Sequence, residues 1–202
     1  MRHGLKRNVY SAMPRPPQYD RQSVLDAATA LFWRRGYTAT SLEDVLSATG
    51  FNRHSLYREF GGKDGLFREA LQNYRALYRA TIGAPLQTDG GLGAIRSLFD
   101  GRLPADLDGR GCLATNTLSE REHVCAQACQ IASGFVDELR SGLAHSVRAA
   151  QAAGEVRGDR DPDALAAYVV TTLQGLGVLS RLGLTDGHAR IVRDETLAYL
   201  TS

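Results

Sequence analysis

The chain has 202 residues, a formal net charge of +2 and a hydrophobic share of 43%, which is enough for a sizeable core and more than one domain. Its three cysteines are too few and too odd in number for a disulfide framework, which argues against a secreted scaffold. The first twenty residues lack an apolar signal-peptide core, and the P-loop, G-x-S-x-G, H-E-x-x-H and dinucleotide-binding patterns are missing. We therefore expect a cytoplasmic protein that is not an enzyme and needs no cofactor.

The charge is unevenly distributed. Residues 1–68 carry eleven Lys and Arg against six Asp and Glu, a net of +5, whereas residues 69–202 carry thirteen against sixteen, a net of −3. A basic segment joined to a mildly acidic one is typical of a DNA-reading domain attached to a domain that does not touch DNA.

The chain begins with a predicted flexible arm at residues 1–19, which holds three prolines and four basic side chains. Binding in the minor groove is one use for such an arm. A first helix is predicted over residues 21–35 from its apolar spacing, and Gly36 ends it.

Two short helices separated by one glycine follow. Ser41 and Asp44 form a capping box at the start of the first, Gly50 supplies a left-handed residue at its end, and Asn52 caps the second. This arrangement predicts a helix-turn-helix, whose second helix enters the major groove of DNA.

The second helix has two distinct faces. Leu56 and Phe60 share the face that must turn to the core, so the opposite face carries the polar side chains. Arginine and histidine can donate to guanine acceptors, and serine suits several partners, so we expect this face to read DNA. The alternative is an ordinary solvated face in a helical interaction module that does not bind DNA. The side chains assigned to this face are Arg53, His54, Ser55, Tyr57 and Arg58.

The rest of the chain also reads as helical, which makes the protein all-α. A linker is predicted over residues 83–91, and Pro104 lies in a second loop. The expected helices span residues 63–82, 92–101, 112–119, 123–153, 162–182 and 188–200.

The last two helices are apolar enough to predict a dimer. Residues 164–180 carry no charge but would span only about 26 Å as a helix and contain threonine, glutamine and glycine, so we expect a buried interface helix and no membrane span. Gly175 and Gly177 would let two backbones approach closely. The predicted interface residues are Leu165, Val169, Leu173, Leu176, Leu179, Ile191 and Leu197.

The cysteines raise two further hypotheses. Cys125 and Cys129 lie one turn apart near His123, but both fall on an apolar stripe and a fourth ligand is not evident, so core packing is favoured over a metal site. Cys112 opens a helix after Arg110, where a thiol could become reactive; filling a tight helix junction is the favoured alternative.

Residues 21–74 resemble the TetR/AcrR family of bacterial transcriptional regulators. The resemblance is carried by the pattern AA-x-x-LF-x-x-x-GY-x-x-TS at residues 27–41 and by GFNR-x-SLY-x-x-FG-x-K-x-x-LF at residues 50–67. It implies a three-helix DNA-binding domain at residues 20–66 and a ligand-sensing and dimerisation domain at residues 67–202.

The resemblance also implies roles for particular side chains. Thr40, Ser41, Tyr57 and Lys63 would contact phosphates, and Arg53, His54, Ser55 and Arg58 would face the groove. Two positions depart from the commonest pattern: His54 replaces a residue that is often small, and Glu59 puts a carboxylate beside DNA, where it would pair with a neighbouring arginine or accept from cytosine.

The expected function is that of a homodimeric repressor released from a palindromic double-stranded operator by a small-molecule effector. Residues 111–120 are similar to an element of a TetR branch in which some members respond to electrophiles or oxidants, so sensing by Cys112 is the alternative. The effector would be small and mostly apolar. The side chains predicted to surround it are Tyr74, Tyr78, Phe99, Cys112, Asn116, Phe135, Tyr168 and Gln174.

Overall fold

The computed structural model describes residues 19–81, 83–88, 90–101 and 109–202, and within these the chain is helical with no β-strand. The all-α prediction is therefore confirmed. The predicted basic arm up to residue 18, Ile82 and the loop around Pro104 lie outside the described residues. The helices are α1 Arg21–Arg35, α2 Leu42–Thr49, α3 Arg53–Phe60, α4 Lys63–Ala80, α5 Ala84–Thr88, α6 Gly91–Asp100, α8 Leu113–Ser119, α9 Ala126–Ala152, α10 Pro162–Ser180 and α11 Asp186–Thr201.

The helix caps predicted in the first sixty residues are present. Ser41 accepts from the Asp44 N–H while the Asp44 carboxylate accepts from the Ser41 N–H, and Asn52 accepts from the Ser55 N–H. Gly50 is left-handed, with φ of 70°. The helix-turn-helix is thus fixed by local chemistry before any packing is considered.

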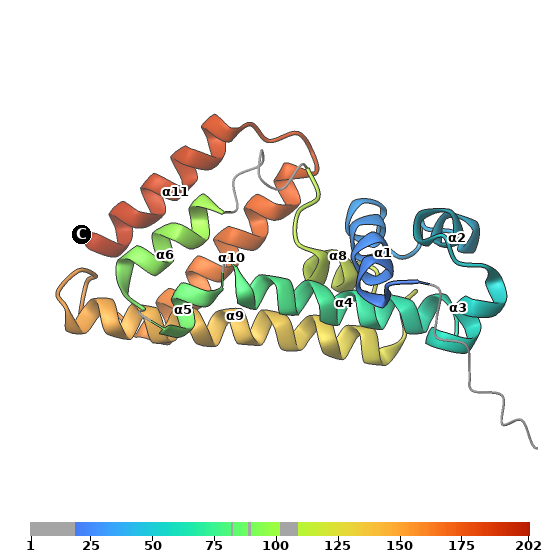
Figure 1. The fold of residues 1–202 in the computed structure, drawn as a ribbon. Coiled ribbons are helices and arrows are strands. Elements are labelled where there is room, and N and C mark those ends of the chain that lie inside the picture. Colours follow the sequence, from blue (N-terminus) through green and yellow to red (C-terminus); the bar gives the residue numbers. More distant parts are fainter. Residues whose placement is uncertain (1–18, 82, 89, 102–108) are drawn as a thin grey trace, which may run out of the picture.

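Helices α1 to α3 close around a small core and pack onto the start of α4. Figure 1 shows them at one end of the molecule, with α4 running from this end along α9 into the other helices. Aromatic contacts bind α1 to α4: the Phe32 and Phe67 ring centroids are 4.8 Å apart. α4 is therefore the continuous connection between the two parts of the chain.

Helix α9 is the centre of the second part. It contacts α4, α5, α6, α8 and α10, and its inward face is buried along its whole length. α10 is long and apolar enough to count as a membrane-span candidate by length and composition, and is the one such helix in the described residues. Eight of its residues are buried and it packs along α9, as expected of a core helix.

Three predicted boundaries are wrong. The supposed linker contains α5, because Leu86 is buried against α9, within 4 Å of where a side chain on Gly142 would start. α9 starts at Ala126, with Cys125 as its N-cap, so Cys125 is not on the helical stripe. α11 starts at Asp186, because the Thr185 side chain caps it.

Candidate nucleic-acid interface

Helix α3 is anchored by two apolar side chains and exposes its polar face. Leu56 is fully buried and Phe60 is 6% exposed, whereas His54 and Arg58 are exposed on the outer side. Tyr57 is 53% exposed. Arg53 is also exposed and Ser55 is half-buried, so the structure leaves all five predicted side chains of α3 at least partly accessible.

An ion pair to the preceding helix holds Arg53 in place. Its Nη2 lies 2.8 Å from Oε1 of Glu43, which comes from the first turn of α2. Both side chains are exposed, so the pair adds little to stability. It does restrict where the Arg53 guanidinium points.

Arg58 is held by a second pair. Its Nε donates to Oε1 of Glu59 at 2.9 Å. The hydrogen bonds from Arg58 and then from the Tyr19 hydroxyl lower the pKa of Glu59, so this carboxylate stays ionised. Pairing with a neighbouring arginine, one of the two expectations for Glu59, is what the structure shows.

One predicted phosphate contact, Thr40, is instead buried in the corner between α1 and α2. Thr40 is 1% exposed, and its hydroxyl donates to the Gly36 carbonyl oxygen at 2.6 Å. Its backbone N–H is also used, by the Tyr37 carbonyl. Thr40 therefore folds the corner and cannot offer its hydroxyl to DNA, whereas Ser41 is exposed beside it.

Lys63 lies against the same corner. Its ammonium sits 3.9 Å from the centroid of the Tyr37 ring, and the Tyr37 hydroxyl donates to the Asp64 carboxylate. Partial burial lowers the pKa of Lys63, although Asp64, Glu120 and Asp44 oppose the shift. Burial, followed by the hydrogen bond to Asp64, raises the pKa of Tyr37.

Sequence reasoning missed three residues that organise this surface: Tyr19, Glu43 and Glu120. Glu120 belongs to the second part of the chain, yet its Oε2 accepts from the Thr38 N–H at 2.7 Å and from the Thr38 hydroxyl at 2.8 Å. The only available signal was its place in the element at residues 111–120, which says nothing about a partner 82 positions earlier.

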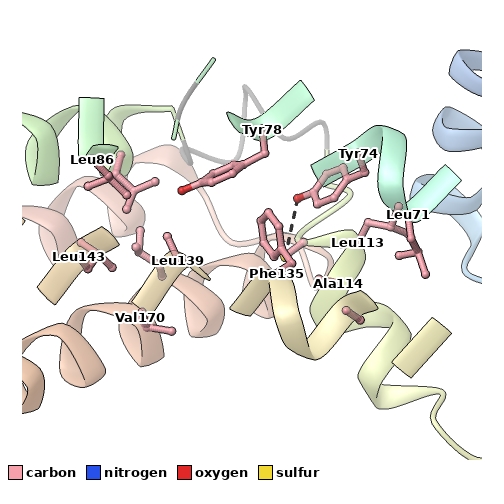
Figure 2. Packing of buried hydrophobic residues seen from close by; sticks show 14 of the residues in the cluster. Leu71, Tyr74, Tyr78, Leu86, Leu113, Ala114, Phe135, Leu139, Leu143 and Val170 are labelled. Atoms are coloured by element: carbon pink, nitrogen blue, oxygen red, sulfur yellow. Dashed lines mark hydrogen bonds between the residues drawn. The ribbon is translucent and has the colours of Figure 1, made fainter. Parts of the chain in front are cut away.

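Four of the residues predicted to bind an effector meet between α4, α8 and α9. Figure 2 shows Tyr74 and Tyr78 of α4 beside Phe135 of α9, with ring centroids 5.5 and 4.9 Å from that of Phe135. The Tyr74 hydroxyl also donates to Sγ of Cys112 at 3.8 Å. Each of these four side chains is at most 6% exposed.

The other predicted effector residues are less concentrated. Phe99 is buried on α6, and the Asn116 amide donates to the Arg110 carbonyl oxygen at 3.0 Å. Gln174 accepts from the Thr115 hydroxyl at 2.6 Å, but its Nε2 is buried without a hydrogen-bond partner among the described residues.

Tyr168 does not lie with this group. It is 44% exposed, its ring contacts Tyr199 at 5.4 Å, and it lines a shallow surface pocket of about 260 Å³ beside Arg160 and α11. Tyr168 therefore does not line an internal site with the other predicted effector residues.

Five predicted dimer contacts are wrong. They are at most 5% exposed within a single chain, so almost none of their surface is left for a partner. Gly177 likewise serves its own chain: a side chain on Gly111 would start 2.5 Å from the Gly177 carbonyl oxygen. The five are Leu165, Val169, Leu173, Leu176 and Leu197.

Leu179 and Ile191 remain available, being 45% and 60% exposed. They belong to a larger set of exposed apolar side chains on α10, the turn after it and α11. The others in this set are Tyr168, Val178, Leu182, Val192 and Tyr199.

Cys125 and Cys129 are both half-buried, and in the described residues no three His, Cys, Asp or Glu side chains are grouped to hold a metal ion. Arg68 reaches Sγ of Cys125 at 3.9 Å.

Two family models match separate parts of the chain. Residues 24–70 match the model of bacterial regulatory proteins of the tetR family, and residues 91–195 match the tetracyclin repressor-like C-terminal domain. The chain belongs to the TetR family. It is thus a DNA-binding regulator of transcription and not an enzyme.

Curated relatives extend over most of the chain. The HTH-type transcriptional repressor ComR of Escherichia coli strain K12 is 32% identical over 192 residues, covering 87% of this chain and 86% of its own. The HTH-type transcriptional repressor DhaR of Mycobacterium sp. strain GP1 is 26% identical and covers 77% and 79%.

Solved structures share the fold. The regulatory protein TetR from Rhodobacter sphaeroides superposes with a TM-score of 0.79 at 22% identity, over 89% of this chain and 97% of its own. A cysteine mutant of the TetR family regulator CifR, complexed with 26-base-pair operator DNA, superposes with a TM-score of 0.77 at 26% identity, over 92% and 99%.

Proposed function

We propose that this regulator is a cytoplasmic repressor that binds a two-fold operator as a homodimer and is released by a small-molecule effector. The observation that carries the proposal is the outer face of α3, where arginines paired with Glu43 and Glu59 stand above a buried Leu56 and Phe60. Repression is supported by the names of ComR and DhaR, and operator binding by the CifR complex.

Residues 20–66 would form the DNA-reading unit. Arg53, His54, Ser55 and Arg58 are proposed to meet base edges, because they occupy the face of α3 opposite its buried anchors. Ser41, Tyr57 and Lys63 are proposed to meet phosphates.

Residues 67–202 would sense the effector and form the dimer. The candidate effector site is the cluster of Tyr74, Tyr78, Cys112 and Phe135, extended by Phe99, Asn116 and Gln174. The buried Nε2 of Gln174, which has no hydrogen-bond partner among the described residues, is the polar group that a mostly apolar ligand could satisfy there. α4 reaches from this cluster to the DNA-reading unit. A ligand that shifts α4 therefore changes the spacing of the two reading heads, which are the DNA-reading units of the two subunits.

Sensing by Cys112 is the second candidate function. Its thiol is 1% exposed and receives the Tyr74 hydroxyl, so a reagent must open the core to reach it, whereas Cys125 and Cys129 are half-buried. Replacing Cys112 with Ser should therefore leave the response of operator binding to N-ethylmaleimide unchanged. Loss of that response would favour the cysteine sensor.

The test of the main proposal is selection of bound duplexes from a random pool by the full chain. We expect a two-fold motif whose binding weakens steeply with salt, because phosphate contacts release counterions. Binding that shows no sequence preference and no salt dependence would instead assign α3 to a helical interaction module.

A further inference from the structure

The turn that joins α1 to α2 is held at both of its ends by its own residues. Gly36 ends α1 with φ of 83°, a backbone conformation that residues other than glycine rarely adopt. The Thr40 hydroxyl then closes back onto the Gly36 carbonyl oxygen at 2.6 Å, and Ser41 starts α2. Thr38, between them, is exposed. The position of Thr38, at the tip of the turn, therefore depends on a contact from outside the turn.

Glu120 is what holds it. One carboxylate oxygen accepts both the N–H and the hydroxyl of Thr38, at 2.7 and 2.8 Å. The other oxygen lies over Gly36, 2.2 Å from where a Cβ would stand, so a side chain at position 36 would push this carboxylate out of its present position. Hydrogen bonds to an ionised carboxylate are stronger than neutral ones, and here two converge on one residue.

Glu120 lies at the end of the short helix α8, and the other end of α8 lies among the candidate effector residues. Glu120 is the C-cap of α8, and Cys112, which receives the Tyr74 hydroxyl, is its N-cap. Between them the helix has seven residues, a length of about 10 Å. The Trp33 indole of α1 also donates to the Gly111 carbonyl oxygen at 2.8 Å. α8 is therefore tied to α1 at one end and to the turn at the other.

The charge of Glu120 works against DNA binding. A carboxylate beside a phosphate-binding surface repels the phosphates. The negative charge of Glu120 also stabilises the charged form of Lys63. Any favourable contribution to DNA binding must therefore come from the geometry that Glu120 imposes on Thr38. The positional effect and the electrostatic effect thus have opposite signs.

We propose that Glu120 is a positioning residue for DNA binding, which holds the turn at residues 36–41 in the shape that presents Ser41 and the start of α2 to the operator. Through this contact, a change in the position of α8 is transmitted to the DNA-reading unit by a route separate from α4. The proposal rests on the proposed function, because it assumes that this turn faces DNA.

The test compares Glu120→Ala with Glu120→Gln in the full chain, using a duplex obtained by selection and a scrambled duplex. Glutamine keeps an oxygen that can accept from Thr38, so its affinity should stay close to that of the unchanged protein. Alanine should weaken operator binding about tenfold or more, with the salt dependence and the melting temperature unchanged. Glu122→Ala removes an exposed glutamate two residues away and should change nothing.

A double-mutant cycle adds a second measurement. Thr38→Val removes one of the two hydrogen bonds, so it should weaken binding when Glu120 is present and have no further effect in Glu120→Ala.

Three results would overturn the proposal. Tighter binding by both variants would show that Glu120 acts by repulsion alone. Equal losses in both, or an unfolded Glu120→Ala protein, would assign it to general stability. Additive effects of Thr38→Val and Glu120→Ala would show that the two residues do not act together. If the unchanged protein binds no selected duplex, the proposed function fails instead.

Discussion

The exposed side chains of α3 and of the start of α4 differ in how they can contact DNA. Arg58 carries a planar guanidinium that can donate twice to guanine, whereas Lys63, stacked on Tyr37, offers a point charge suited to phosphate. The tie from Arg58 to Glu59 limits the directions in which the guanidinium can point. We therefore expect base discrimination to depend on Arg58 and general affinity on Lys63.

Truncation of Arg58 should relax sequence preference. Arg58→Ala is expected to reduce the discrimination between selected and scrambled duplexes by about 1–3 kcal/mol, because a base contact is lost. Lys63→Gln is the matched comparison, and it should weaken both duplexes equally and lower the salt slope by about one. Titrations of both duplexes at several salt concentrations measure these effects. Full discrimination by the Arg58→Ala protein would mean that α3 reads DNA with another face.

The capping box makes the helix-turn-helix sensitive to acid. The Ser41 hydroxyl, the Ser41 N–H and then Arg35 lower the pKa of Asp44 from 3.8 to about 2. A lowered folded-state pKa stabilises the fold above the ordinary value, and this stabilisation is lost as the pH falls from about 4 towards 2.

The acid sensitivity can be measured with Asp44→Asn. The variant should be less stable than the unchanged protein near neutral pH, and the difference in free energy of unfolding should shrink as the pH falls through that window. Denaturant unfolding at several pH values gives the difference directly, and Glu122→Gln serves as the surface control. A difference that does not vary with pH would show that the Asp44 charge contributes nothing to the cap.

At the scale of helices, the sequence predicts those features that depend on neighbouring residues. Asp44, Gly50 and Asn52 identify the helix-turn-helix because each cap is made within a few positions of the residue it serves. α5 is missed because its one strong determinant, the burial of Leu86, is provided by α9 more than fifty positions later.

Periodicity also fails to say which chain buries a residue. The leucine stripe of α10 predicts burial correctly, but Val169 and Leu173 are already fully buried within their own chain, where α10 packs along α9, so they are not dimer contacts. The same limit applies to the candidate site: the outer face of α3 follows from its period, whereas Glu120 and Tyr19 depend on contacts that the sequence does not encode locally.

Helices α10 and α11 should form the dimer through the apolar side chains that their own chain leaves exposed. Leu182 is 78% and Ile191 60% exposed, and a double change to Glu would put charges into an apolar contact. We expect Leu182→Glu with Ile191→Glu to sediment as a monomer at micromolar concentration and to bind the operator weakly. Leu77→Glu, at a 55% exposed leucine on α4, is the control and should remain a dimer. A dimeric double variant would place the interface elsewhere.

For the whole molecule, the spacing of the two reading heads decides which DNA is bound. Each head is fixed to its own regulatory domain by α4, by the Trp33 contact to Gly111 and by the Glu120 contact to Thr38. In a two-fold dimer the two α3 helices must then meet major grooves that lie on the same side of the duplex, one turn or a whole number of turns apart. With the heads held by these contacts, we expect binding to depend on the helical phase of the two half-sites.

Five base pairs inserted at the centre of the operator should therefore abolish the benefit of binding both halves. The insertion turns one half-site by about half a turn, which the heads cannot follow without breaking their contacts to α8 and α4. Engaging two sites at once typically multiplies affinity by about 10²–10⁴, so we expect a loss of about 100-fold or more. Replacing five central base pairs without changing the length is the control and should cost far less. Equal affinity for the inserted and original duplexes, measured by titration, would show that the heads move independently, and the route from effector to DNA through fixed spacing would then be untenable.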